Sequence, residues 1–169
     1  MKVSKILTSK RLTWILLCVG LCLPLFLYVR HLLPPVVRKD GNMVIWVTRK
    51  EMCVLKIDDK ESIGRLRDAM NEDFRQRELT MSQLSTPDRP FVNYVIFYFD
   101  DGQTFAYLVV SNGYLIYKER YYEGHRTLAM LESLRSEGKA TPVGRNEAME
   151  ILPETYRGFA GFAIPVSDD

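Results

Sequence analysis

Two turn signals constrain the middle of the chain more than any other feature. Asp101-Gly102 and Asn112-Gly113 separate three runs that are rich in β-branched and aromatic residues: residues 91–99, 104–110 and 114–121. Asp-Gly and Asn-Gly favour a type I′ turn, because both central residues of that turn need a positive φ. The pattern therefore predicts a three-stranded antiparallel meander.

A second hairpin is predicted ahead of the meander, with strands at residues 44–47 and 52–57. Asp58 and Glu61 have the spacing of a capping box, which predicts a helix that ends near residue 77. Four apolar residues of that helix recur at helical spacing, and Glu61 stands four residues before Arg65 on its polar side. The apolar stripe predicts that the helix packs on the sheet.

The second half of the chain predicts two further helices, at residues 125–137 and 145–152. The apolar stretch at residues 155–166 is a candidate edge strand. Because strands and helices do not alternate strictly, the expected class is α+β. The expected architecture is an N-terminal transmembrane helix followed by a small antiparallel sheet. That sheet consists of the meander and the hairpin, packed against two or three helices.

A long apolar run near the N-terminus predicts a membrane span. Residues 12–29 contain 18 residues without a charge, and extension to residue 33 gives a helix of roughly 33 Å. Trp14 and Tyr28 bracket the run at positions that suit the membrane interface. The alternative is a cleaved signal peptide, but no small-x-small cleavage site follows the run. The sequence therefore favours an uncleaved anchor.

The resulting domain prediction has four segments: a basic cytoplasmic head at 1–11, a transmembrane helix at 12–33, a linker at 34–43 and a soluble domain at 44–169. Positive residues are slightly more numerous before the span than directly after it, which favours a cytoplasmic N-terminus. The expected location is a bacterial cell membrane, crossed once by a signal-anchor, with the soluble domain extracytoplasmic.

Charge is distributed unevenly along the chain. Five of the 23 Lys and Arg residues precede residue 36, whereas all 21 Asp and Glu residues follow it, so residues 36–169 carry a net charge of −3. A mildly acidic domain lacks the positive field on which non-specific nucleic-acid binding depends. Nucleic acid is therefore not expected as a partner.

No catalytic, cofactor or metal site is predicted. The soluble domain holds one cysteine, Cys53, and one histidine, His125, which is too few for a zinc site. Cys53, His125 and Asp100 contain the side chains of a catalytic triad, but nothing in the sequence brings them together. The sequence therefore does not decide whether the protein is an enzyme, and a non-enzymatic protein is the preferred interpretation.

Tyrosines concentrate in the meander and suggest a partner-binding sheet face, because tyrosine offers a large contact area with a polar tip. The candidate residues of this face are Tyr94, Tyr98, Tyr107 and Tyr117. The alternative is that tyrosines line a half-buried sheet because of their high β-propensity.

Residues 44–122 also carry a resemblance. The strand that ends in Lys56-Ile57-Asp58-Asp59, the helix at 60–71 and the tyrosine-rich hairpin with its Asp-Gly turn resemble small membrane- or lipid-anchored exported domains of Gram-positive bacteria. The resemblance implies an exported location and supplies no functional residue.

The expected function is a membrane-tethered, extracytoplasmic, non-enzymatic accessory or sensing domain that binds a membrane or envelope protein. The alternatives are an anchored envelope hydrolase and an immunity-type protein. The oligomeric state stays open.

Overall fold

In the computed structural model, the described residues are 33–48, 53–80, 92–110 and 113–157, together with residues 14, 16, 20 and 22–25. The chain divides into two compact units, Met1–Pro34 and Pro35–Asp169. The sheet, the helices and the candidate site described below all belong to the second unit.

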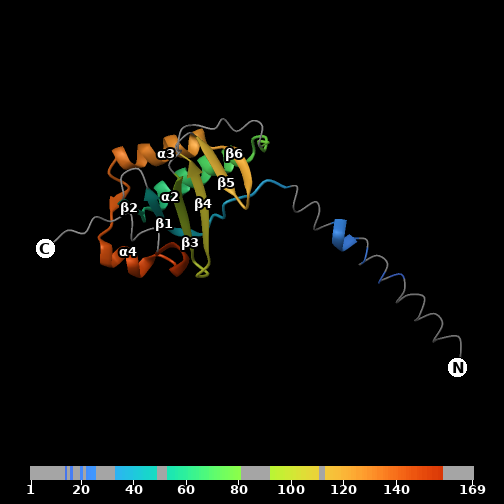
Figure 1. The fold of residues 1–169 in the computed structure, drawn as a ribbon, viewed down its shortest axis with the longest axis horizontal. Coiled ribbons are helices and arrows are strands. Elements are labelled where there is room, and N and C mark those ends of the chain that lie inside the picture. The colour runs from blue at the N-terminus through green and yellow to red at the C-terminus, as the bar shows by residue number, and fades with distance from the viewer. Residues whose placement is uncertain are drawn as a thin grey trace, which may run out of the picture. The chain divides into compact units, whose positions relative to one another are not determined.

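One antiparallel sheet organises the described part of the second unit (Figure 1). Its seven strands stand in the spatial order β6-β5-β4-β3-β1-β2-β7. Their bounds are β1 Gly41–Thr48, β2 Cys53–Ile57, β3 Val92–Phe99, β4 Thr104–Val110, β5 Tyr114–Tyr117, β6 Arg120–Glu123 and β7 Thr141–Pro142. Every pairing between neighbours is antiparallel.

The predicted architecture is wrong in the size of this sheet. The predicted hairpin and meander are one continuous sheet, because β1 and β3 pair directly, with Val44 opposite Phe97. Both strands carry apolar side chains on both faces. Those side chains are buried only if the strand lies in the middle of a sheet that is covered on both faces. The segment predicted as one strand at 114–121 is a hairpin of β5 and β6, and β7 adds the last strand beside β2.

The turns of the meander differ in how visible they are in the sequence. Gly102 and Gly113 have φ angles of +78° and +86°, but Asp101 does not have a positive φ, so the turn at Asp101-Gly102 is not the predicted type I′ turn. Its glycine still adopts a conformation that other residues rarely occupy. The turn between β5 and β6 places Lys118 and Glu119 at φ angles of 48° and 65°. Side chains other than glycine rarely occupy this region, so nothing in the sequence indicates the turn.

Helix α2, Lys60–Phe74, covers one face of the sheet. Its N-cap is Asp59 and not the predicted Asp58: the Asp59 carboxylate accepts hydrogen bonds from the Ser62 backbone N–H at 3.1 Å and from the Ser62 hydroxyl at 2.6 Å. The predicted apolar stripe is confirmed, since its four members are buried: Ile63, Leu66, Met70 and Phe74.

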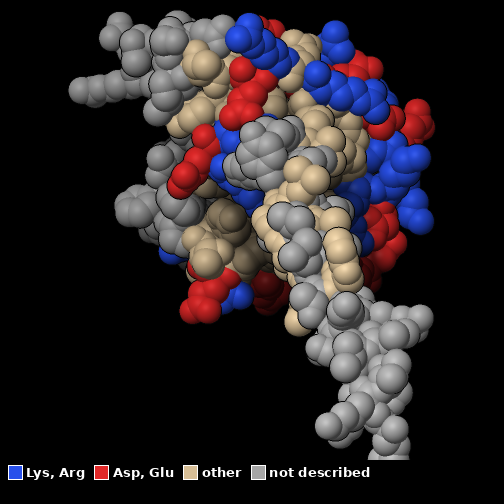
Figure 2. Space-filling view, turned by 90° about the vertical axis from the view of Figure 1, so that its right-hand side faces the viewer, with Lys and Arg blue, Asp and Glu red and all other residues tan. Residues whose placement is uncertain are grey.

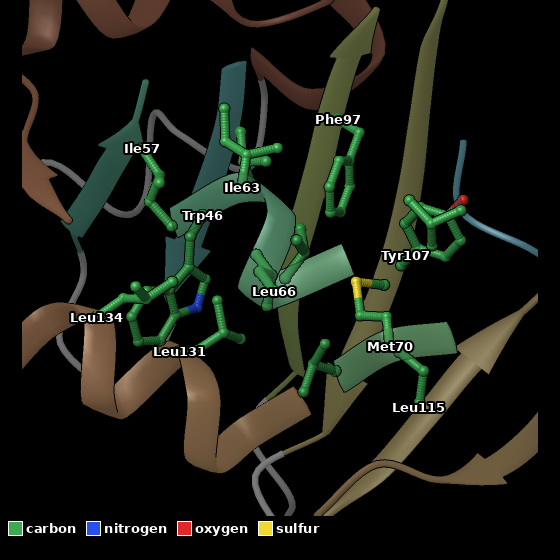
Figure 3. Close-up of a cluster of buried hydrophobic side chains, with 14 of the residues drawn as sticks. Trp46, Ile57, Ile63, Leu66, Met70, Phe97, Tyr107, Leu115, Leu131 and Leu134 are labelled. Carbon is green, nitrogen blue, oxygen red and sulfur yellow. The ribbon is translucent and has the colours of Figure 1, made fainter. Parts of the chain in front are cut away.

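Helix α3, His125–Ser136, packs beside α2 and completes the main core. Trp46 from β1 lies against Leu131 and Leu134 of α3, while Leu66 and Met70 of α2 approach the sheet next to them (Figure 3). All five side chains are at most 2% exposed. Complete burial of such side chains contributes about 1.5–3 kcal/mol each to folding.

A smaller core lies on the opposite face of the sheet, under helix α4, Arg145–Ile151. Ile45, Val47, Val54 and Ile96 point to this side and pack with Ala148 and Leu152. Helices α3 and α4 therefore lie on opposite sides of the sheet (Figure 1). Residues 154–157 form a further helical turn, and the rest of the candidate edge strand at 155–166 is outside the described residues.

The predictions that concern a membrane are corrected. In the described part of the chain, no helix combines the length and the apolar character that crossing a membrane requires. This finding overturns the transmembrane helix at 12–33, the signal-anchor, the integral one-span protein and the single-pass cell-membrane location. The head at 1–11 and most of 12–33 lie outside the described residues.

The transmembrane helix was predicted from an uncharged run, and such a run shows only that the side chains are apolar. A span also requires about 20 residues in one continuous helix. No helix among the described residues reaches that length with the apolar character of a span.

Candidate functional site

The four tyrosines of the predicted binding face do not share a surface. Tyr107 and Tyr117 point into the main core, where their rings stack with centroids 5.1 Å apart. Tyr107 is 3% exposed and its ring lies 5.7 Å from that of Phe74. Burial raises the pKa of Tyr107 far above its usual range, so the hydroxyl stays neutral.

Tyr94 and Tyr98 project from the opposite face, toward the residues around α4. The Tyr98 hydroxyl donates a hydrogen bond to the backbone oxygen of Ile151, and burial raises the pKa of Tyr98 to about 12. The ring of Tyr94 lies 5.8 Å from that of Tyr156, edge to face. The structure thus brings the tyrosines together in two pairs, one on each side of the sheet, and each pair packs within the fold.

The side chains that could have formed a triad are also apart. Asp100 is exposed just before β4, whereas His125 is exposed beside Gly113, just after β4. A seven-residue strand separates them, which is roughly 20 Å. Cys53 lies in β2, beside a shallow pocket of about 500 Å³ at the β7 end of the sheet. Within the described residues, no group of His, Cys, Asp and Glu could hold a metal ion.

The segment predicted as a linker is instead fixed to the domain. Val37 is 1% exposed, and its backbone N–H donates to Asn71 Oδ1 at 2.7 Å. Asn71 Nδ2 donates in return to the backbone oxygen of Val37 at 3.2 Å. This two-point contact holds residues 36–39 against the outer side of α2.

Arg38 connects the same segment to the turn between β3 and β4. Its guanidinium pairs with Asp40 and, at 2.9 Å, with Asp101, and it lies 4.8 Å from the ring centroid of Phe99. The pKa of Asp101 is lowered, first by the hydrogen bond from the Gln103 backbone N–H and then by the Arg38 side chain. The charge of Arg38 is therefore already compensated within the protein.

Between this segment and α2 lies a hollow of about 520 Å³, which we call the basic pocket. It is lined by Val36, Val37, Arg38, Lys39, Arg67, Asp68, Asn71, Glu72 and Arg75. Both acids of the lining have partners, since Asp68 pairs with Arg67 and Glu72 with Arg126. Lys39 and Arg75 are exposed and form no ion pair among the described residues. The pocket thus carries two uncompensated positive charges.

The other charges that line the basic pocket are already paired, which distinguishes Lys39 and Arg75 from them. Lys and Arg side chains line one edge of the face in Figure 2, with Asp and Glu side chains between them. Such mixed surfaces largely neutralise themselves through short ion pairs. Two cations without ion pairs therefore leave the lining of the basic pocket with a net positive charge.

A second hollow, of about 600 Å³, lies between α2 and α3 on their outer side, and we call it the interhelical groove. It is lined by Arg65, Asp68, Ala69, Glu72, Arg126, Ala129, Met130 and Ser133. Arg65 pairs with Glu137 at one end, and Glu72 pairs with Arg126 at the other. The two helices are therefore antiparallel, and the small side chains of Ala69 and Ala129 leave the space between the ion pairs open.

The ion pair of Arg65 also corrects a prediction. The sequence pairs Arg65 with Glu61 along α2, but the structure pairs it with Glu137 through two hydrogen bonds of 2.7 and 2.9 Å. This contact, followed by the hydrogen bond from the Ser133 hydroxyl, lowers the pKa of Glu137 to about 2. A bidentate contact across two helices outweighs the weaker pairing within one helix.

The basic pocket and the interhelical groove are neighbours. They share Asp68 and Glu72, which stand one turn apart on α2 and form the ridge between the two hollows. Sequence reasoning did not identify this site, because the docking of residues 36–39 on α2 creates it. The sequence gives no local signal for the site, because Arg75 has acids at helical spacing on both sides, Glu72 and Glu78.

Comparison with known proteins adds no further constraint: no family model matches the chain, and neither curated proteins nor solved structures give a match. The resemblance to exported domains of Gram-positive bacteria therefore stays a prediction.

Proposed function

We propose that the domain is a non-enzymatic binding module, and that an acidic segment of a partner protein docks in the basic pocket. The observation that carries this proposal is the pair of uncompensated cations, Lys39 and Arg75, on the rim of a hollow whose other charges are already paired. A carboxylate placed there gains charge-assisted hydrogen bonds without breaking an existing ion pair.

The rigidity of the pocket supports binding. One wall is a continuous helix, and the other is held by Val37 in the core and by Asn71. A site that is formed before the ligand arrives loses little conformational entropy on binding. More of the energy of the contacts with the partner therefore contributes to the affinity than at a site that has to become ordered on binding.

The number of cations indicates a protein ligand and not a nucleic acid. Binding to nucleic acid at physiological salt rests on contacts with several phosphates, whereas the pocket offers two free cations in a domain of net charge −3. One or two carboxylates of an acidic protein segment match that supply. Arg75 suits a bidentate contact, and Lys39 acts as a point charge.

The hydrolase alternative receives less support. Its simplest form needs His125 close to a carboxylate at the bottom of a pocket. His125 is exposed at the start of α3, and in the described part of the chain it forms no hydrogen bond with a carboxylate. The binding proposal needs no such arrangement.

The proposal is tested by selecting random dodecapeptides displayed on phage against the full-length chain. We expect the selected peptides to be enriched in Asp and Glu. The enrichment should disappear with Lys39→Gln/Arg75→Gln and persist with Lys60→Gln/Arg145→Gln. The control variant removes the same charge at two exposed cations outside both hollows, each also without an ion pair among the described residues.

Against one selected acidic peptide, the first variant should lose about tenfold in affinity, since each exposed ion pair is worth up to about 1 kcal/mol. Equal enrichment with both variants would contradict the proposal.

A further inference from the structure

We infer that the interhelical groove binds a large apolar side chain of the same partner segment. The recognised motif would then combine an acid with an apolar residue across the α2 ridge. This inference rests on the proposed function, because it assigns the second contact of the segment that the basic pocket holds.

The groove favours an apolar occupant because its polar groups are already engaged. Arg65 binds Glu137, Arg126 binds Glu72, and the Ser133 hydroxyl donates to Glu137 at 2.7 Å. A polar ligand would have to compete with these contacts. An apolar side chain gains by covering the floor instead, where Ala69, Ala129 and the half-buried Met130 present carbon atoms.

Methionine at the floor suits a site that accepts side chains of different shape. Its unbranched, polarisable side chain adapts to the group that packs on it. With a hollow of about 600 Å³ above it, the groove has room for Leu, Met or Phe. We therefore expect a large apolar side chain at this position of the motif, without a preference for one residue type.

The shared ridge fixes the distance between the two contacts. Asp68 and Glu72 border both hollows, so a ligand that reaches both must cross α2. A helix with its side chains is about 10 Å across. The acid and the apolar residue should therefore stand roughly three positions apart in an extended segment, which rises about 3.3 Å per residue.

The ridge also separates two surfaces of different charge. The charges that line the groove are paired with one another or with neighbours, so an acid held there gains no new ion pair, whereas an acid beyond the ridge faces Lys39 and Arg75. Moving an acid into the groove also costs part of its hydration without a new partner in return. An acid at the apolar position of the motif should therefore not be enriched.

The inference is tested with the same displayed dodecapeptides and the full-length chain, by adding variants that fill the groove. Ala129→Trp covers the floor at an exposed position of α3, and Ser136→Trp is its control, exposed on the same helix but outside both hollows. Circular dichroism verifies that both variants keep the fold. If Ala129→Trp does not, the uncharged Ala129→Gln takes its place.

We expect acidic peptides with a large apolar residue at a constant spacing. Ala129→Trp should weaken the binding of such a peptide at least fivefold, and Ser136→Trp should leave it unchanged. Acidic peptides without an apolar preference, bound equally by both Trp variants, would overturn this inference and leave the proposed function intact. If peptides selected with Lys39→Gln/Arg75→Gln kept both the acidic and the apolar preference, the proposed function and this inference would both be overturned.

Discussion

The Asp73 carboxylate at the end of α2 caps the first turn of α3 through Thr127. Its Oδ2 atom accepts hydrogen bonds from the Thr127 backbone N–H at 2.9 Å and from the Thr127 hydroxyl at 2.7 Å. Gly124 occupies the N-cap position of α3 and has no side chain to supply this contact. A Cβ at Gly124 would lie 2.8 Å from the backbone nitrogen of Leu115, so the cap comes from another helix.

This relationship gives a prediction for the stability of the domain. Asp73→Ala removes the cap and leaves the buried donors of Thr127 without their acceptor, so it should lower the free energy of unfolding by about 2 kcal/mol. Asp73→Asn keeps an acceptor and should cost less than half as much. Urea unfolding of both variants measures the difference, with Glu132→Ala on the exposed side of α3 as a control that should stay within about 0.5 kcal/mol of the wild type. If Asp73→Ala were as stable as the control, the capping role would be refuted.

The same carboxylate predicts a dependence of stability on pH. Burial raises the pKa of Asp73 above its ordinary value of 3.8, and the hydrogen bonds from Thr127 offset only part of that effect. The folded state therefore binds the proton more tightly than the unfolded state does. The resulting stabilisation is complete below pH 3.8 and is lost as the pH rises through the folded-state pKa.

The measurement for this prediction is the stability of the wild type relative to Asp73→Asn, from unfolding curves at several pH values above about 3.8. The relative stability of the wild type should fall as the pH rises. A relative stability that rises with pH would mean that the carboxylate is better stabilised in the fold than in water.

The turn between β5 and β6 offers a stabilising substitution. Glu119 adopts a φ of 65° in a two-residue turn between the paired residues Tyr117 and Arg120. Glycine reaches this conformation without steric cost, so Glu119→Gly should raise the free energy of unfolding by about 0.5–1 kcal/mol.

Gly102→Ala is the matched opposite of that change. Its φ is +78° and no atom lies within 4 Å of the added Cβ, so any loss of stability is conformational. Thermal unfolding should therefore move the midpoint up for Glu119→Gly and down for Gly102→Ala. A shift in the same direction for both variants would contradict the conformational explanation.

Parts of this fold follow from local chemistry and were predicted for that reason. The positive φ of Gly102 and the buried stripe of α2 are set by neighbouring residues. The turn at Lys118 and Glu119 escaped prediction because its residue types do not favour its conformation. The position of the α2 cap was missed because Asp58 and Asp59 both have side chains that could accept the hydrogen bonds.

Local residue types could not show on which side of the sheet each tyrosine lies. Alternation within β3 puts Tyr94 and Tyr98 on one side, but the pairing of β3 with β4 decides that Tyr107 lies on the other. The basic pocket depends on a contact between Val37 and Asn71, which are 34 residues apart. No periodicity of the sequence indicates a contact of that kind.

The central claim is that Lys39 and Arg75 bind an acidic segment of a partner protein. Isothermal titration of one selected acidic peptide into the full-length chain tests it most directly, with Lys39→Gln/Arg75→Gln compared with Lys60→Gln/Arg145→Gln at two salt concentrations. We expect about tenfold weaker binding for the first variant only, together with a weaker salt dependence, because fewer charges then contribute. Equal affinities for the two variants would show that the basic pocket does not hold the acid, and would contradict the account.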